Sequence, residues 1–341
     1  MLYIEKLVQS IKDSYELPNK VLEKVQEPKV TVGTITYNHL PYIEKCIQGV
    51  LMQKTTFSFE FIIGEDFSTD GTREIVFEYA KKYPKVIRVI TADYNVGWQA
   101  NGLRCFKAYR GKYIALCEGD DYWTDPFKLQ KQVDFLENNP EYIIAYHQCL
   151  VKHPDKPNMK DYIKPKTGKD YTAYELIATP KSIQLATRLF RNVFKEQDND
   201  FPLEKFGDYF MNAYLGTFGK CKFLSTIKPS VYNKHAGGIW SSLDDKSKIY
   251  HGIRAHAEIC NYFIDRYFIE KKDDRLVRIR LKVLTDYLKE KWYPMEYPGN
   301  VKFKVNSANA LFAFYGMRFE FYYKPWVIQI NKIIRRLFGK S

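Results

Sequence analysis

Short apolar runs and amphipathic stretches alternate through the first half of the chain, from about residue 29 to residue 150. Apolar runs with the length of buried strands lie at residues 30–36, 59–64, 86–90 and 113–117. Between the first two runs, apolar residues recur at helical spacing, at Ile43, Cys46, Ile47, Val50 and Leu51. This alternation predicts an α/β fold, with a mostly parallel sheet and helices on both faces.

The pattern changes in the second half of the chain. A helix is expected to begin at Asp125-Pro126, with Asp as its cap and Pro in its first position. The pattern then predicts a loop at 152–170, a strand at 183–191, a helix at 203–215, a strand at 221–227 and helices at 248–268 and 274–291. We therefore predict three parts: an N-terminal helical segment (1–27), an α/β domain (28–242) and a helical C-terminal region (243–341).

The net charge and the cysteines indicate which kinds of molecule the protein binds and in which compartment it lies. The net charge of +13 favours anionic partners such as phosphates, nucleic acid or an acidic membrane surface. No helix-turn-helix, zinc-finger or RNP-type motif is present, so we expect no nucleic acid. Six scattered cysteines indicate free thiols in a reducing compartment. The N-terminus does not resemble a signal peptide, and we expect a cytoplasmic protein.

Three carboxylates follow the fourth apolar run, in the sequence Glu118-Gly119-Asp120-Asp121. A strand that ends in clustered carboxylates places hard oxygen ligands at the rim of the sheet, where open α/β sheets bind ligands. Mg²⁺ or Mn²⁺ takes such carboxylates together with substrate phosphates. The alternative is a solvated acidic turn with no ligand.

The first strand leads into Tyr37-Asn38-His39-Leu40 and not into a G-x-G-x-x-G turn, so a dinucleotide fingerprint is absent. A nucleotidyltransferase would share the acidic site but would usually carry a Gly-rich basic loop near this strand. That loop is also absent.

Four segments together resemble the bacterial glycosyltransferases of family 2, which have the GT-A fold, over about residues 28–242. They are VTVGTITYNH (30–39), IIGEDFSTDGT (62–72), ALCEGDDYWTDPFKLQKQVDFLENNPE (115–141) and the pair FGDY (206–209) and YNKHAGGIWS (232–241). The second segment resembles the usual V-D-D-G-S-T-D-G-T. The third resembles the metal-binding segment of the family and the helix that follows it.

The resemblance implies a GT-A catalytic domain, a Rossmann-like sheet flanked by helices, with a helical C-terminal extension. It also implies an inverting enzyme that moves a sugar from a nucleotide sugar, UDP-linked in our interpretation, to a hydroxyl of a glycan or lipid-linked acceptor in surface polysaccharide synthesis. A divalent ion, Mn²⁺ or Mg²⁺, would bridge the diphosphate. The alternative is a nucleotide-sugar-binding or nucleotidyltransferase relative that transfers no sugar.

The resemblance also assigns site residues. Asp120 is the expected metal ligand, with Glu118, Asp121 and His235 as further candidates. Glu118 could instead contact the ribose or a ligand water, and Asp121 the sugar. The expected nucleotide-binding residues are Thr36, Tyr37, Glu65, Asp66, Asn95, Gly97, Arg104, Glu118 and Asp121, and Asp66 matches the carboxylate that accepts the uracil N3–H.

Asp208 is the candidate general base, because it follows Gly207 and opens a helix as the catalytic Asp of the family does. Many relatives carry Glu-Asp where this chain has Gly207-Asp208. The alternative is a helix-capping Asp. A base needs a pKa near the working pH, so Asp208 is expected to be partly desolvated.

The C-terminal segment from Trp326 to Lys340 has an apolar arc and an opposite basic face when it is drawn as a helix. A basic amphipathic helix can lie on an anionic bilayer, which would place the protein on the inner face of the cell membrane. The alternative is that the helix packs on the catalytic domain.

Overall fold

The computed structural model describes residues 2–19, 27–156, 158–164, 167–178, 183–194, 207–263 and 282–283. Its helices are α1 (Leu2–Lys12), α2 (Ile43–Leu51), α3 (Thr72–Lys82), α4 (Trp98–Lys107), α5 (Lys128–Asn138), α6 (Ala173–Ala178), α7 (Asp208–Leu215) and α8 (Asp245–Phe263). A 3₁₀ turn, η2, covers Leu185–Thr187.

The strands are β1 (Tyr15–Glu16), β2 (Val30–Thr36), β3 (Phe59–Glu65), β4 (Ile87–Thr91), β5 (Tyr113–Leu116), β6 (Tyr142–Tyr146), β7 (Cys149–Lys152), β8 (Tyr162–Lys164), β9 (Leu189–Arg191), β10 (Lys220–Phe223) and β11 (Ser230–Asn233). Within the described ranges they form an eight-stranded sheet in the order β1-β4-β3-β2-β5-β9-β6-β10 and a three-stranded sheet in the order β11-β7-β8.

The large sheet confirms the predicted α/β fold, because β2, β3, β4 and β5 are parallel and alternate with helices. Two strands depart from the parallel pattern. β9 runs antiparallel to both β5 and β6, and β1, the edge strand, pairs antiparallel with β4.

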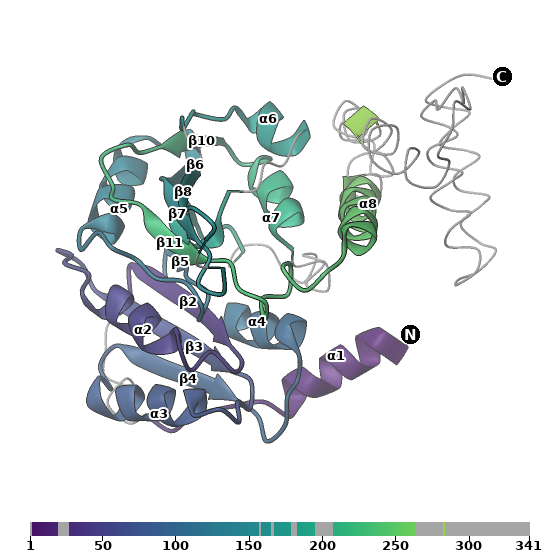
Figure 1. Cartoon of the computed structure of the whole chain (residues 1–341). Helices are drawn as coiled ribbons and strands as arrows, with labels where there is room; N and C mark the ends of the chain where they lie inside the picture. The colour runs from purple at the N-terminus through teal and green to yellow at the C-terminus, as the bar shows by residue number, and fades with distance from the viewer. Residues whose placement is uncertain are drawn as a thin grey trace. The chain divides into compact units, whose positions relative to one another are not determined.

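Alternating residues of the central strands enter two separate apolar clusters, one on each face of the sheet. Phe61 and Ile63 of β3 pack with residues of α2, α3 and α5, whereas Ile62 packs with residues of α4 and α7. Figure 1 shows α2, α3 and α5 on one side of the strands and α4 and α7 on the other. Helices on both faces explain why these strands are continuous apolar runs and not alternating ones.

The structure corrects several boundaries of the sequence analysis. The predicted loop at 152–170 contains the short strand β8, and the predicted strand at 183–191 is the η2 turn followed by β9. The helix expected at Asp125-Pro126 begins at Lys128, and the Asp125 carboxylate accepts the backbone N–H groups of Phe127, just before the helix, and of the distant Lys228. The expectation of helix throughout residues 1–27 missed β1.

The chain divides into two compact units, one of residues 1–176 and 180–242 and the other of residues 177–179 and 243–341. α8 belongs to the second unit. No helix among the described residues is both long and apolar enough to cross a membrane. The predicted helix at 274–291, apart from residues 282–283, and the amphipathic segment at 326–340 lie outside the described residues.

Gly111 marks a close approach of two backbones where the chain enters β5. An added Cβ would overlap the backbone nitrogen of Thr31 and lie 2.7 Å from the carbonyl carbon of Val30. Backbone atoms inside a sheet cannot move aside, so we expect Gly111→Ala to lose about 1–3 kcal/mol of unfolding free energy. Gly102, inside α4, is the control, because nothing lies within 4 Å of its Cβ position.

Gly102→Ala should gain about 0.5–1 kcal/mol from helix propensity. Urea unfolding followed by circular dichroism measures both changes. Equal midpoints for Gly111→Ala and wild type would show that the two backbones can separate at no cost.

Candidate active site

The carboxyl ends of β2, β3 and β5 meet at one edge of the large sheet. β2 pairs in parallel with β3 on one side and with β5 on the other, so the strand order reverses beside β2. Open α/β sheets bind ligands outside the carboxyl ends of their strands at such a switch point. The segments that follow these three strands therefore define the candidate site.

Gly119 brings the segments after β2 and β5 into contact. Its backbone N–H donates to Ile35 O at 3.0 Å. A Cβ at this position would lie 2.6 Å from Thr36 Oγ1 and 2.9 Å from His39 Nδ1. Only glycine allows this approach without displacing the two side chains. Thr36, a predicted base contact, is buried here against the acidic segment.

Glu118, Asp120 and Asp121 offer carboxylate oxygens within 4.8 Å of one another, the spacing of a cation site. The pKa of Glu118 is raised well above its usual range, mainly by burial and then by the charges of Asp120 and Asp208. Its carboxylate has no hydrogen-bond partner among the described residues. Three carboxylates crowded in this way repel one another, so a divalent cation would stabilise them.

Asp121 differs from its two neighbours because it already has a fixed partner. It is buried, and its Oδ1 accepts the backbone N–H of Asn233 at 3.0 Å. The side chain of Asn233 in turn donates to the backbone oxygen of Asp120 at 2.6 Å. Asp121 therefore attaches the end of β11 to the acidic segment. These contacts favour a positioning role over its predicted role as a metal or sugar ligand.

His235 lies two residues beyond β11 and reaches the cluster as predicted. Its Nε2 is 3.0 Å from Asp120 Oδ2. This contact is the main reason why the pKa of His235 is raised. His39, which the sequence analysis did not assign, lies on the other side, with Nε2 4.0 Å from the same oxygen.

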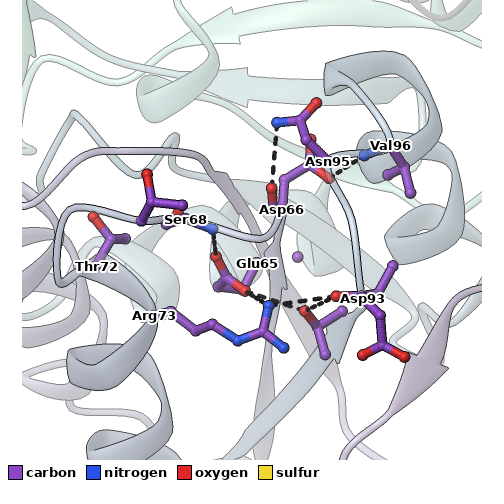
Figure 2. Close-up of polar contacts among 12 residues, drawn as sticks. Glu65, Asp66, Ser68, Thr72, Arg73, Asp93, Asn95 and Val96 are labelled. Atoms are coloured by element: carbon purple, nitrogen blue, oxygen red, sulfur yellow. Dashed lines mark hydrogen bonds and ion pairs between the residues drawn. The ribbon is translucent and has the colours of Figure 1, made fainter.

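Asp66, at the end of β3, is buried and holds the loop before α4. Its two oxygens accept the backbone N–H groups of Val96 at 2.8 Å and Gly97 at 3.0 Å. Figure 2 shows this carboxylate facing the loop, with Asn95 donating to the backbone oxygen of Asp66. Burial raises the pKa of Asp66 against the lowering effect of these two N–H groups and of Arg104. Asp66, Asn95 and Gly97 thus lie together, and their contact with a nucleotide stays a prediction.

Glu65 and Arg104 are buried residues near this loop, and both make several hydrogen bonds within the fold. Glu65 is 0% exposed, and its carboxylate accepts from Ser68 N at 2.6 Å, Arg73 at 3.0 Å and Thr91 at 3.1 Å. Figure 2 shows Ser68 and Arg73 beside this carboxylate. Arg104 is buried as well and donates to the backbone oxygen of Glu65 at 2.8 Å. For both residues the contacts favour a positioning role, and their contact with the nucleotide stays a prediction.

Two aromatic residues at the same edge are exposed. Tyr37, the other predicted base contact, is 45% exposed just after β2. Phe67 is 38% exposed and has φ of +60°, a left-handed conformation that is rare for a bulky residue. Phe67 stands where the usual family motif has glycine. The Arg73 guanidinium lies 5.1 Å from its ring centroid and covers one face.

Asp208 is the first residue of α7, and its carboxylate is not a helix cap. The carboxylate pairs with Arg188 at 3.3 Å. The N-cap position of α7 is Gly207, and no side chain caps this helix end. Burial raises the pKa of Asp208, whereas the Arg188 charge lowers it. Arg188 is fully buried, also donates to Asn212 at 2.7 Å and counters the charges of both Asp208 and Glu118. The charge of Asp208 also contributes to the raised pKa of Glu118, after burial and the charge of Asp120.

Three residues of this site were missed by the sequence analysis: His39, Arg188 and Asn233. His39 had one available signal, because it lies three residues after the first strand and on the predicted ligand edge. Arg188 and Asn233 carried no signal. Each lies in a short, weakly patterned segment whose partner is distant in sequence.

Sequence comparison decides the family. The profile of Glycosyl transferase family 2 matches residues 31–197. An uncharacterized protein of Mycobacterium tuberculosis is 35% identical over 237 residues, which are 67% of this chain and 67% of that protein. The chain belongs to glycosyltransferase family 2. The teichuronic acid biosynthesis glycosyltransferase TuaG of Bacillus subtilis is 36% identical over 110 residues, 32% of this chain and 42% of TuaG.

Solved structures agree on the fold of this glycosyltransferase. TarS of S. aureus, residues 1–349 in complex with UDP-GlcNAc, superposes with a TM-score of 0.56 at 20% identity and covers 83% of this chain and 79% of that chain. The mannosyltransferase PcManGT of Pyrobaculum calidifontis, in complex with GDP-Man and Mn²⁺, has a TM-score of 0.52 at 16% identity, with 100% and 95% covered. These likenesses confirm the GT-A fold.

The hydrogen bonds of Asp66 predict that replacing it by Asn lowers the unfolding free energy. An Asn side chain has a single acceptor oxygen, so Asp66→Asn must turn its NH₂ group toward either Val96 N–H or Gly97 N–H. One buried donor then loses its partner, and we expect a loss of about 1–3 kcal/mol in unfolding free energy. Amide hydrogen exchange at Val96 and Gly97 should accelerate. The matched control is Asp93→Asn, which is exposed and should change stability by less than about 0.5 kcal/mol. Unchanged exchange in Asp66→Asn would contradict this account of the loop.

Proposed function

We propose that this glycosyltransferase moves a sugar from a UDP-linked donor to a hydroxyl of a glycan or lipid-linked acceptor in surface polysaccharide synthesis, with inversion at the anomeric carbon. One observation carries the proposal. Asp208 opens α7 as a carboxylate outside the groups that could hold a cation, and the buried Arg188 pairs with it at 3.3 Å and fixes its position. A positioned carboxylate that is not itself a cation ligand can serve as a general base.

The donor class is supported by the relatives and by the site. TarS is solved with UDP-GlcNAc and PcManGT with GDP-Man, which supports a nucleotide sugar as the donor here. For a uracil base, Asp66 offers a buried carboxylate that could accept N3–H through a remaining lone pair. Tyr37 offers an exposed ring at the same edge. The teichuronic acid role in the name of TuaG supports a polysaccharide product.

The side chains at the strand ends fit a divalent cation. Asp120 is shared by both groups that could hold one, Glu118 with Asp121 and His39 with His235. A bound ion would neutralise charge on the diphosphate as it leaves. The fit rests on crowded carboxylates and an unpartnered Glu118 within the described residues.

Asp208 would take the proton of the acceptor hydroxyl while that oxygen attacks the anomeric carbon. The new glycosidic bond forms as the bond to the diphosphate oxygen breaks, and the nucleoside diphosphate leaves with the bonding electrons. Arg188 stabilises the anionic form of Asp208 before the transfer. A single displacement of this kind needs only one base and inverts the centre.

The charge of the chain bears on its acceptor and on its location in the cell. The net charge of +13 is compatible with an anionic surface such as the inner leaflet of the cell membrane. The segment that would contact it, residues 326–340, lies outside the described residues. A lipid-linked acceptor would bring the enzyme to that surface.

Replacing Asp208 by Asn tests the base directly. The change is nearly isosteric and removes basicity, so we expect turnover to fall by about 10²–10⁴. Release of UDP from a panel of UDP-sugars with an acceptor extract measures turnover, and calorimetry measures UDP affinity, which should stay near wild type. Asp134→Asn, an exposed change on α5, is the control. Wild-type turnover in Asp208→Asn would place the base elsewhere, and binding without any UDP release by the wild type would indicate a sugar-binding relative.

Arg188 should set the pH range of this reaction. The base works only when deprotonated, so kcat falls as the pH falls through the pKa of Asp208, which lies above the ordinary 3.8. Because Arg188 lowers that pKa, its removal in Arg188→Met should move the acidic limb of the kcat profile to higher pH. Arg188→Lys keeps the charge and should shift the limb less. An unmoved limb in a folded Arg188→Met variant would show that Asp208 does not titrate in that limb.

A further inference from the structure

Three side chains from three separate strand ends converge at one point. His39 follows β2, Asp120 follows β5 and His235 follows β11. Their ligand atoms all lie within 4.8 Å of one another. His235 Nε2 lies 3.0 Å and His39 Nε2 lies 4.0 Å from Asp120 Oδ2. Ligand atoms held about 2.1 Å from one ion are at most about 4.2 Å apart, so both distances suit a shared ion.

The His39 ring is oriented as a metal-binding imidazole is. Its Nδ1 lies 3.2 Å from Thr36 Oγ1, which leaves Nε2 facing Asp120. At 4.0 Å this Nε2 is too far for a hydrogen bond to Asp120, and it has no other hydrogen-bond partner among the described residues. Metal-binding histidines usually have their second ring nitrogen held by a hydrogen bond in this manner.

The loop that carries His39 is fixed by the turn after β3. Asn38 has φ of +53°, and its N–H donates to Ser68 Oγ at 3.0 Å. The N–H of His39 donates to Thr72 Oγ1 at 2.9 Å, and that hydroxyl donates to Asp70 at 2.6 Å. Asn adopts the left-handed conformation more readily than most residues, and these hydrogen bonds from the turn after β3 fix the loop that carries His39.

His235 is held just as firmly on the opposite side. Its ring packs on Tyr42 with centroids 4.7 Å apart. The preceding Asn233 is tied to Asp120 and Asp121 by hydrogen bonds of 2.6 and 3.0 Å. Asp121 therefore uses one oxygen to hold Asn233, two residues before His235. Asp120 is the carboxylate that lies near both imidazoles.

We propose that His39, Asp120 and His235 bind one divalent transition-metal ion, with Mn²⁺ bound in preference to Mg²⁺. The inference rests on the proposed function, because this ion is the one that would face the donor diphosphate. Two imidazoles and one carboxylate suit Mn²⁺ and related transition metals, whereas Mg²⁺ favours oxygen ligands. His39 thus determines which metal the site accepts, and the open positions remain for phosphate oxygens.

Electron paramagnetic resonance tests the ligand set on the full chain with Mn²⁺ and UDP and no donor sugar. Spin-echo modulation should show coupling to two imidazole nitrogens in the wild type and to one in His39→Gln. Titration of the free Mn²⁺ signal should show about 10–100-fold weaker binding in His39→Gln. The preference for Mn²⁺ over Mg²⁺ should shrink, since Gln supplies an oxygen.

His251→Gln is the matched control, because His251 is exposed on α8 and lies apart from the cluster in sequence. It should leave both signals unchanged, and urea unfolding should show that His39→Gln remains folded. A single nitrogen coupling in the wild type, or unchanged Mn²⁺ affinity in His39→Gln, overturns the inference even when UDP-sugar turnover is normal. Two nitrogens in a wild type that turns over no nucleotide sugar would support the metal site and reject the proposed function.

Discussion

The parallel pairing of β2 with both β3 and β5 is the constraint on which the site depends. Thr36 at the end of β2 is in register with Glu65 of β3, and Gly33 with Leu116 of β5. This register fixes where each strand stops, and so it places the turns that carry His39, Asp66 and Asp120 side by side. A slip of one residue would turn the apolar side chains of β2 to the wrong face and separate these groups.

Two kinds of buried carboxylate lie at this edge. Their hydrogen-bond partners distinguish the carboxylates that stabilise the loops from those available to a ligand. Glu65 and Asp66 are surrounded by donors, so their charges are satisfied within the fold. Glu118 has no such donors among the described residues; burial and the charges of Asp120 and Asp208 raise its pKa, and only the charge of Arg188 lowers it. A fold tolerates a carboxylate with so little compensation where a ligand completes it. The segment that follows β5 therefore carries the groups available to a ligand, and the segment that follows β3 is held by hydrogen bonds within the fold.

Prediction from sequence succeeded where the signal is local. β2 to β5 are apolar runs between turn signals, so their local sequences predict them, and the acidic segment could be assigned from its place after β5. β11 was missed because its sequence, SVYN, contains no apolar run, and β6 was also not predicted. The roles of Asp121 and Glu65 could not be predicted, because they depend on Asn233 and Arg73, which only the folded chain brings near.

The contact of His235 with Asp120 joins residues 115 positions apart, and Asn233 reaches Asp120 across 113. The sheet around β2 can pair before β11 is made, but the imidazole side of the site can assemble only after residue 235 has left the ribosome. An ion held between Asp120 and His235 would bind the completed chain and not its shorter precursors. By mass action it would then draw β11 into place, so that loading of the metal and the last step of folding become one equilibrium.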